Sequence, residues 1–286
     1  MSHNKHVHSL SKYFPRLGLS CLLLCILSGV ILSFHYRPMG NVFQNVEEIT
    51  TVIPFGKFFR QFHYASGQLF VILMLVHTVD YFLRRRYLTY SPRGWTLLIL
   101  SLYLCFFTLF SGFILKGDKE GLFAGNIFMS IAKTVPFVGD PVSRLLIVPG
   151  KSFFFLPYLH HCLFSPLLII YLIRAHIREW LPDQKFLFSA TIGIFLYALL
   201  VDPFMDIPPE APVELVTGPW FFLGIQSLLK VAPPLWGGLV IPGIFAVCLL
   251  MLPFSRNVSG RVLHYFVMAT FCGYGLLTLR AFLVGP

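Results

Sequence analysis

The sequence is poor in charged residues. Only 12% of its 286 residues are charged, whereas 56% are hydrophobic and 31 are phenylalanine. A soluble globular domain carries about 25% charged residues, so this composition excludes an ordinary soluble domain. We predict an all-α, polytopic transmembrane helix bundle, because several apolar stretches approach the roughly 17–25 residues that a membrane span needs. About seven spans are expected, the fifth being short, near residues 17–36, 62–83, 95–115, 155–178, 186–202, 235–253 and 263–282.

Acidic residues are scarcer than basic ones, at 12 against 22, for a net charge of +10. Nucleic-acid binding would require a basic face on a soluble fold, and we do not expect it here. With the N-terminus in the cytoplasm, the segments on that side hold twelve basic and three acidic residues, and the other side holds ten and nine. This asymmetry is typical of the positive-inside rule. We predict an integral protein of a bacterial-type inner (cytoplasmic) membrane, surrounded by lipid, with the N-terminus cytoplasmic, the C-terminus outside and no cleavable signal peptide.

The six cysteines lack the C-x-x-C-H arrangement that attaches a c-type haem covalently. All six fall within predicted spans, where cysteine behaves as a small apolar packing residue. Any haem in this protein is therefore expected to be held without covalent bonds, as a b-type haem.

Four histidines occur at paired spacings within two predicted spans. His63 and His77 are 14 residues apart, and His161 and His176 are 15 apart. A helix turns by 100° and rises by about 1.5 Å per residue. The second histidine of each pair therefore lies within about 40–60° of the helix face that carries the first, roughly 21–22 Å further along the axis. If the two helices are antiparallel, His63 meets His161 near the outer side and His77 meets His176 near the inner side. Ionisable residues at membrane depth are costly and usually functional.

This arrangement is typical of two b-type haems, each with two axial imidazole ligands from facing helices. His160 is an alternative to His161, but its spacing of 16 from His176 places the two about 160° apart, so we favour His161. A second alternative is that the histidines only hydrogen-bond to neighbouring helices. Arg60, three residues before His63, could pair with a haem propionate. Arg84, seven after His77, could do the same or serve as a positive-inside anchor.

The segments between spans carry further signals. We expect short helices on the membrane surface within 116–154 and an amphipathic segment at 220–231. The loop at 202–219 is rich in proline and carries Asp202, Asp206, Glu210 and Glu214. This acidic loop and the long 116–154 loop are where we expect a partner redox protein to dock. Residues 1–16 form a basic tail that we expect to be solvated.

The sequence resembles cytochrome b of the quinol–cytochrome c oxidoreductase (bc and b6f) complexes, in the form of a cytochrome b joined to a part similar to subunit IV. The resemblance extends over nearly the whole chain after residue 12. The motifs that carry it in the first part are Phe34–Pro38, Arg60–His63 with His77, Pro92-Arg93, Gly112–Leu115, Val135–Pro141, and His161 with Pro166 and His176. Those in the second part are Thr217–Leu223 and Trp236–Gly238.

The resemblance implies a di-haem four-helix module over residues 1–183 and a three-helix module over 184–286. It also implies that Gly29 and Gly112 make room for a haem, and that a quinone binds on the inner side. The expected partners are a cytochrome c or multihaem c subunit, an iron–sulfur (Rieske-like) subunit, or both, within a dimeric complex of several subunits. The chain would carry electrons between quinone and these partners, and we do not expect it to be an enzyme on its own.

Several positions depart from the family pattern. Pro219 stands where the family has the glutamate that accepts a proton from quinol, and Lys116–Lys119 replaces a second motif of the same pocket. These changes favour an alternative, a transmembrane electron conduit or anchor without quinol oxidation at the outer site, unless Asp118, Glu120 or Glu214 substitutes as the base. Further departures are Pro15 and Leu98 at two inner glycine positions, Asp80 at a basic position, and Tyr13 at the cysteine that tethers an extra haem in the chloroplast branch. A transporter or channel without haem is the more distant alternative.

Overall fold

The computed structural model describes residues 3–202, 207–212, 216–255 and 257–285, with side chains from residue 12 onward. The described residues form helices joined by turns, and no strand occurs among them. Six helical segments are long and apolar enough to cross a membrane: Lys12–Ser33, Gly56–Leu83, Pro92–Ile114, Phe155–Ile173, Trp236–Phe254 and Val258–Val284. The prediction of a polytopic helical bundle is therefore confirmed. The short fifth span corresponds to α9 (Gln184–Leu200), which has 17 residues.

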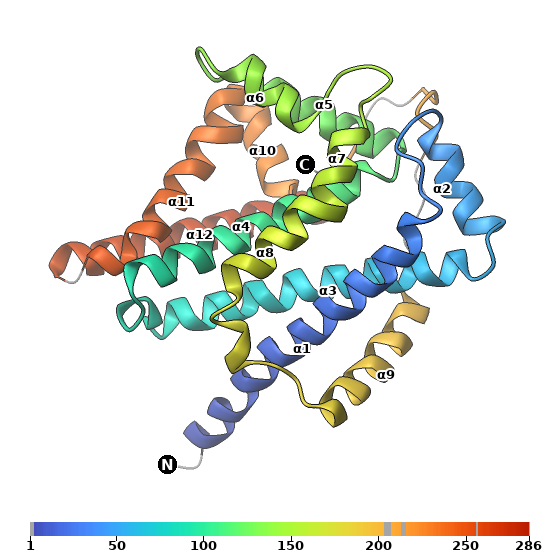
Figure 1. Ribbon diagram of the computed structural model, residues 1–286. Helices are drawn as coiled ribbons and strands as arrows, with labels where there is room; N and C mark the ends of the chain where they lie inside the picture. The colour runs from blue at the N-terminus through green and yellow to red at the C-terminus, as the bar shows by residue number, and fades with distance from the viewer. Residues whose placement is uncertain (1–2, 203–206, 213–215, 256, 286) are drawn as a thin grey trace.

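The first part of the chain forms a bundle around α1 (His3–Ser33) and α3 (Gly56–Leu83), which pack along each other (Figure 1). Small residues allow this close approach, since Cys21 and Ala65 are both completely buried. α4 (Pro92–Ile114) packs against α8 (Ser165–Ile173). α9 lies on the outside of α1 and α3, and its buried residues Ala190, Ile194 and Ala198 join the same apolar core.

The last part of the chain packs against α4 and the turn that precedes it. α10 (Leu223–Val231) contacts α12 (Val258–Val284), and α11 (Ile241–Met251) contacts both α12 and α4. A second core joins the two parts, where the buried Trp95 of α4 donates a hydrogen bond of 2.8 Å to the carbonyl oxygen of Leu249. The described residues of 184–286 therefore contact the first bundle through α9, through α11–α12 and through the segment that precedes α10.

Three shorter helices lie at one end of the bundle, near α7 (Phe155–Leu159): α2 (Val42–Thr51), α5 (Lys119–Lys133) and α6 (Gly139–Leu146) (Figure 1). The expected helices within 116–154 are confirmed by α5 and α6, and the amphipathic segment at 220–231 by α10. Helix α2 was not predicted, although the spacing of its buried Val42, Val46 and Ile49 is helical.

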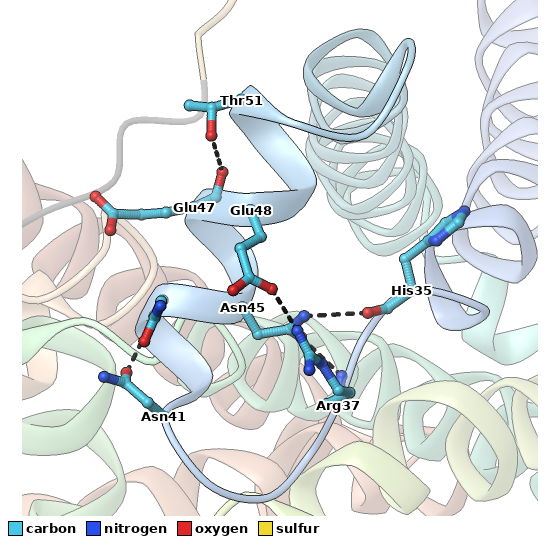
Figure 2. A network of polar contacts seen from close by, with 8 residues as sticks. His35, Arg37, Asn41, Asn45, Glu47, Glu48 and Thr51 are labelled. Atoms are coloured by element: carbon cyan, nitrogen blue, oxygen red, sulfur yellow. Dashed lines mark hydrogen bonds and ion pairs between the residues drawn. The ribbon is translucent and has the colours of Figure 1, made fainter.

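A polar network fastens α2 to the segment that leaves α1 (Figure 2). Asn45 donates from Nδ2 to the carbonyl oxygen of His35 and accepts from the backbone N–H of Arg37 at 2.7 Å, while the Arg37 guanidinium pairs with Glu48. Nearby, the Tyr36 hydroxyl donates to the carbonyl oxygen of Leu115 at 3.0 Å. Burial raises the pKa of Tyr36, so this hydroxyl stays protonated as the donor. The end of α1 is thereby fixed to the end of α4.

Two helix boundaries differ from the sequence-based expectation. α1 extends back to His3 and contains Pro15, whereas we predicted a tail over 1–16. The predicted span 155–178 is not one regular helix, because a π-helical turn, η2 (His160–Phe164), separates α7 from α8. Pro166 follows this turn and provides its physical reason, since a proline inside a helix removes a backbone hydrogen bond. His176 lies in a turn three residues beyond α8, before η3 (Ile177–Glu179).

Candidate di-histidine sites

The structure brings His63 of α3 and His161 of η2 together, with ring centroids 5.9 Å apart and ring planes inclined by 78°. Each ring is held by a backbone carbonyl group: His63 Nδ1 lies 2.9 Å from the Cys25 oxygen, and His161 Nδ1 lies 2.8 Å from the Thr108 oxygen. Because a carbonyl oxygen can only accept, both Nδ1 atoms must carry the proton. The Nε2 atoms therefore keep their lone pairs, as metal-binding imidazoles require.

Two glycines lie directly beside this outer pair. A Cβ atom at Gly29 would lie 2.8 Å from Cε1 of His63, and one at Gly112 would lie 2.5 Å from Cε1 of His161. Carbon atoms in ordinary contact are about 3.5–4.0 Å apart. Each histidine ring can thus occupy its position only because the facing residue, on α1 or α4, has no side chain.

The second pair, His77 and His176, also has ring centroids 5.9 Å apart, with planes inclined by 35°. His77 is buried, and its Nε2 atom has no hydrogen-bond partner among the described residues. Burying such a group without a partner is unfavourable. The Nε2 atom of His77 is therefore a candidate for binding a ligand. His176 Nδ1 lies 3.3 Å from the Tyr90 hydroxyl.

An apolar cavity opens between the helices that carry the second pair. It encloses about 720 Å³, including space open to solvent, and His77, Tyr81, His176 and Trp180 line it together with side chains of α1, α4 and α8. Pro15 and Leu98, which replace two glycines of the family pattern, are also part of the lining. The cavity therefore lies directly beside the inner pair, and two residues larger than glycine form part of its wall.

The donor sets fit a metal-centred macrocycle with one imidazole on each side. Two imidazoles on one metal ion, with metal–nitrogen bonds of about 2.0–2.1 Å, have ring centres roughly 6 Å apart. In both histidine pairs the ring centroids are 5.9 Å apart. His160 does not join either pair, because its Nε2 faces the carbonyl oxygen of Leu145 at 3.2 Å. Of the two neighbouring histidines that the sequence left open, His161 is the one that faces His63.

The two arginines expected to assist have protein partners. The Arg60 guanidinium bonds to the Thr50 hydroxyl of α2. Arg84 Nε pairs with Asp80 Oδ1 at 2.7 Å, and the two residues share a helix face because they are four positions apart. Neither arginine is thereby assigned to a propionate, and that role stays a prediction for both.

The residues considered as substitute bases on the outer side form a compact ion cluster. Asp118 is completely buried, accepts from the Gly121 N–H at 2.9 Å as the N-cap of α5, and lies 2.7 Å from Lys116 Nζ. Glu120 also contacts Lys116, at 3.4 Å. Asp118 is thus engaged in holding α5. Glu214, the third residue considered, and Asp206 of the acidic loop lie outside the described residues.

The segment around Pro219 is tied to the bundle by side-chain amides. Gln226 accepts from the Gly218 N–H at 2.8 Å, and Gln68 of α3 accepts from the Trp220 indole at 2.8 Å. Tyr274 of α12 donates to the carbonyl oxygen of Phe221 at 3.0 Å. This segment, where the family carries its glutamate, therefore joins α3, α10 and α12, and Pro219 offers no proton acceptor.

Fold and sites together define a class of protein, a membrane-spanning helical bundle with two cross-helix histidine pairs. A family model, Cytochrome b/b6/petB, matches residues 4–180, which is more than half of the chain. The chain belongs to the cytochrome b/b6 family, as the sequence motifs predicted. It is an integral membrane protein, and membership of this family implies haem b and interaction with quinone.

Individual relatives support the same assignment. Cytochrome b of Oenothera berteroana is 26% identical over 287 residues, covering 87% of this chain and 72% of the relative. The menaquinol:cytochrome c reductase cytochrome b subunit of Geobacillus thermodenitrificans is 27% identical over 156 residues, covering 53% of this chain and 70% of the relative. A solved chain of a hyperthermophilic respiratory Complex III has a TM-score of 0.66 at 18% identity and covers 94% of this chain and 91% of its own. At that identity the structural match shows the fold alone.

Proposed function

We propose that this chain is the di-haem cytochrome b subunit of a quinol:cytochrome c oxidoreductase-type complex and carries electrons across the membrane. The observation that carries the proposal is the presence of two histidine pairs at the same ring separation of 5.9 Å. They are joined by α3, on which His63 and His77 are 14 residues, or roughly 21 Å, apart. His63 and His161 would hold an outer b-type haem, and His77 and His176 an inner one.

Haem b supplies a one-electron carrier whose potential depends on ligand hydrogen bonding and burial. The protein's own part is to hold the imidazoles. The carbonyl groups of Cys25 and Thr108 keep Nδ1–H of His63 and His161 occupied, so that the lone pair of each Nε2 stays available. Gly29 and Gly112 leave these rings the room they need. Most of the side chains that line the inner cavity around His77 are apolar.

The proposal includes a quinone on the inner side and partner redox subunits, a cytochrome c or multihaem c protein, a Rieske-like protein, or both, on the outer side. Two relatives are named menaquinol:cytochrome c reductase subunits, which supports quinol chemistry in the complex. The distribution of charge supports a cytoplasmic N-terminus and an outer C-terminus, in a bacterial-type membrane. We retain the division into modules 1–183 and 184–286 as part of the proposal.

One specific observation favours the alternative of a conduit without outer quinol oxidation. Pro219 cannot accept a proton, and Asp118 is buried in an ion pair while it caps α5. Glu120 is the remaining described carboxylate of that cluster, and Lys116 contacts it as well. Quinol oxidation at the outer site would therefore use Glu120, Glu214 or a group on another subunit as the proton acceptor.

A difference spectrum of the purified oxidised complex separates these possibilities. Quinol is added first and dithionite afterwards. A b-type band that rises with quinol alone is the expected result, and it supports communication between a quinone site and the haems. A band that rises only with dithionite would favour the conduit. The absence of a b-type band with either reductant would overturn the proposal.

A further inference from the structure

The turn between α3 and α4, residues 84–91, carries two tyrosines that contact opposite parts of the molecule. The Tyr90 hydroxyl lies 3.3 Å from Nδ1 of His176, in the inner histidine pair. The Tyr87 hydroxyl lies 3.1 Å from Nδ1 of His264, in α12. Tyr87 lies within the short helix η1 (Arg86–Leu88) and Tyr90 two residues beyond its end, and their hydroxyl groups contact different helices. The turn thus connects the last helix of the chain to the inner pair.

The contact with α12 is tightly packed. Tyr87 is 3% exposed and His264 is 5% exposed, although both carry polar groups. The His264 ring stacks on Phe82, with centroids 4.4 Å apart, and Tyr87 also packs edge-on against Trp95. Arg85, just before η1, adopts a left-handed conformation with φ of 53°. A non-glycine residue keeps such a conformation where its surroundings fix it, so this packing holds the turn in one shape.

The inner pair differs from the outer pair in what holds its rings. Both outer Nδ1 atoms bond to backbone carbonyl groups of α1 and α4. His176, by contrast, lies beyond the end of α8, and its Nδ1 meets the side-chain hydroxyl of Tyr90. The Tyr90 ring also lies beside Tyr81 of α3, with centroids 6.0 Å apart, and the Tyr81 ring packs on His77 at 4.3 Å. The orientation of His176 therefore depends on side chains and on the position of the turn.

We propose that Tyr90 is a positioning residue for His176, and that the Tyr87–His264 contact holds it in place, so that α12 helps to set the inner redox centre. The inference rests on the proposed function, in which His176 is an axial ligand through Nε2. Its Nδ1–H then donates to the Tyr90 oxygen. Such a hydrogen bond makes an imidazole a stronger donor to a metal, which favours the oxidised form and lowers the reduction potential of the inner haem.

The test is a redox titration of the b-type bands in the purified complex with Tyr90→Phe. Phenylalanine keeps the ring and removes the acceptor. We expect the equilibrium constant for reduction of the inner haem to increase by up to about tenfold. This corresponds to a rise of about 59 mV in its reduction potential for one electron, with the potential of the outer haem unchanged. Tyr87→Phe should move the same haem in the same direction by a smaller amount. The inner component is identified as the one lost in His77→Leu.

Tyr103→Phe is the matched control, because Tyr103 lies within α4 and makes no hydrogen bond or ring contact with either histidine pair; it should leave both potentials unchanged. If the wild type shows two b-type components and Tyr90→Phe moves neither, or moves both equally, the inference is wrong while the proposed function stands. A wild type without two b-type components contradicts the proposed function itself.

Discussion

Single residues determine how closely α1 and α4 approach the histidine rings of the outer pair. Gly29 and Gly112 face His63 and His161 from α1 and α4, and a Cβ atom at either position would overlap the ring. Sequence comparison with the family pattern singled out these two glycines but could not place them against the rings. The distances supply a physical reason for that pattern and make it testable.

Gly112→Ala should weaken haem binding at the outer site. The new Cβ would lie 2.5 Å from His161 Cε1, so the ring must shift by about 1 Å to regain ordinary contact. We expect a loss of one b-type component, or a large reduction in it, in the dithionite-reduced spectrum of the purified protein, with the other component retained.

Gly273→Ala is the matched control, because a Cβ atom at this helical position in α12 meets nothing within 4 Å. Alanine favours a helix over glycine by about 1 kcal/mol, so this variant should fold and keep both components. Equal haem content in Gly112→Ala and Gly273→Ala would show that the Gly112 contact has no bearing on the site.

The helices show where sequence periodicity succeeds and where it fails. The spacing of His63 and His77 lies within the regular α3, and the pairing that the spacing predicted is found. The spacing of His161 and His176 gave the right pairs although the segment is not one regular helix. A π-helical turn adds a residue that no hydrophobic pattern reveals, and only the proline after it was a signal. Tyr90 could not be found from the sequence, because its contact with His176 crosses 86 residues.

The helix α5 depends on its N-cap, and this dependence can be measured. Asp118 is fully buried and pairs with Lys116, whose side chain is 20% exposed. Asp118→Ala removes the cap, which typically costs about 0.5–2 kcal/mol, and it also takes from the mostly buried Lys116 its nearest carboxylate, leaving Glu120 at 3.4 Å. We expect amide hydrogen exchange over residues 119–133 to accelerate strongly in nanodiscs.

Asp183→Ala serves as the comparison, since Asp183 caps α9 by the same bond, to the Phe186 N–H at 2.9 Å, but is exposed. That change removes only a cap, at about 0.5–2 kcal/mol, and should accelerate exchange in the first turn of α9 alone. Similar effects of the two substitutions would contradict the assigned role of the Lys116–Asp118 pair.

At the scale of the whole molecule, composition and hydropathy were sufficient for the membrane bundle, because apolar length alone identifies a span. They could not predict how the parts meet. α9 packs on α1 and α3, while α11 contacts Trp95 of α4 and α12 contacts Tyr87 of the turn at 84–91. Such contacts depend on side-chain shape across long sequence separations. The described structure thereby links the last helix to the inner histidine pair.

The haem b content of the purified protein tests the central claim most directly. The account predicts two haems per chain, one in His161→Leu, one in His176→Leu, and none in the double variant. His160→Leu is the control and should keep both, because His160 faces the Leu145 carbonyl group and neither pair. A wild type with fewer than two haems, or a His161→Leu or His176→Leu protein that retains both, would contradict the account.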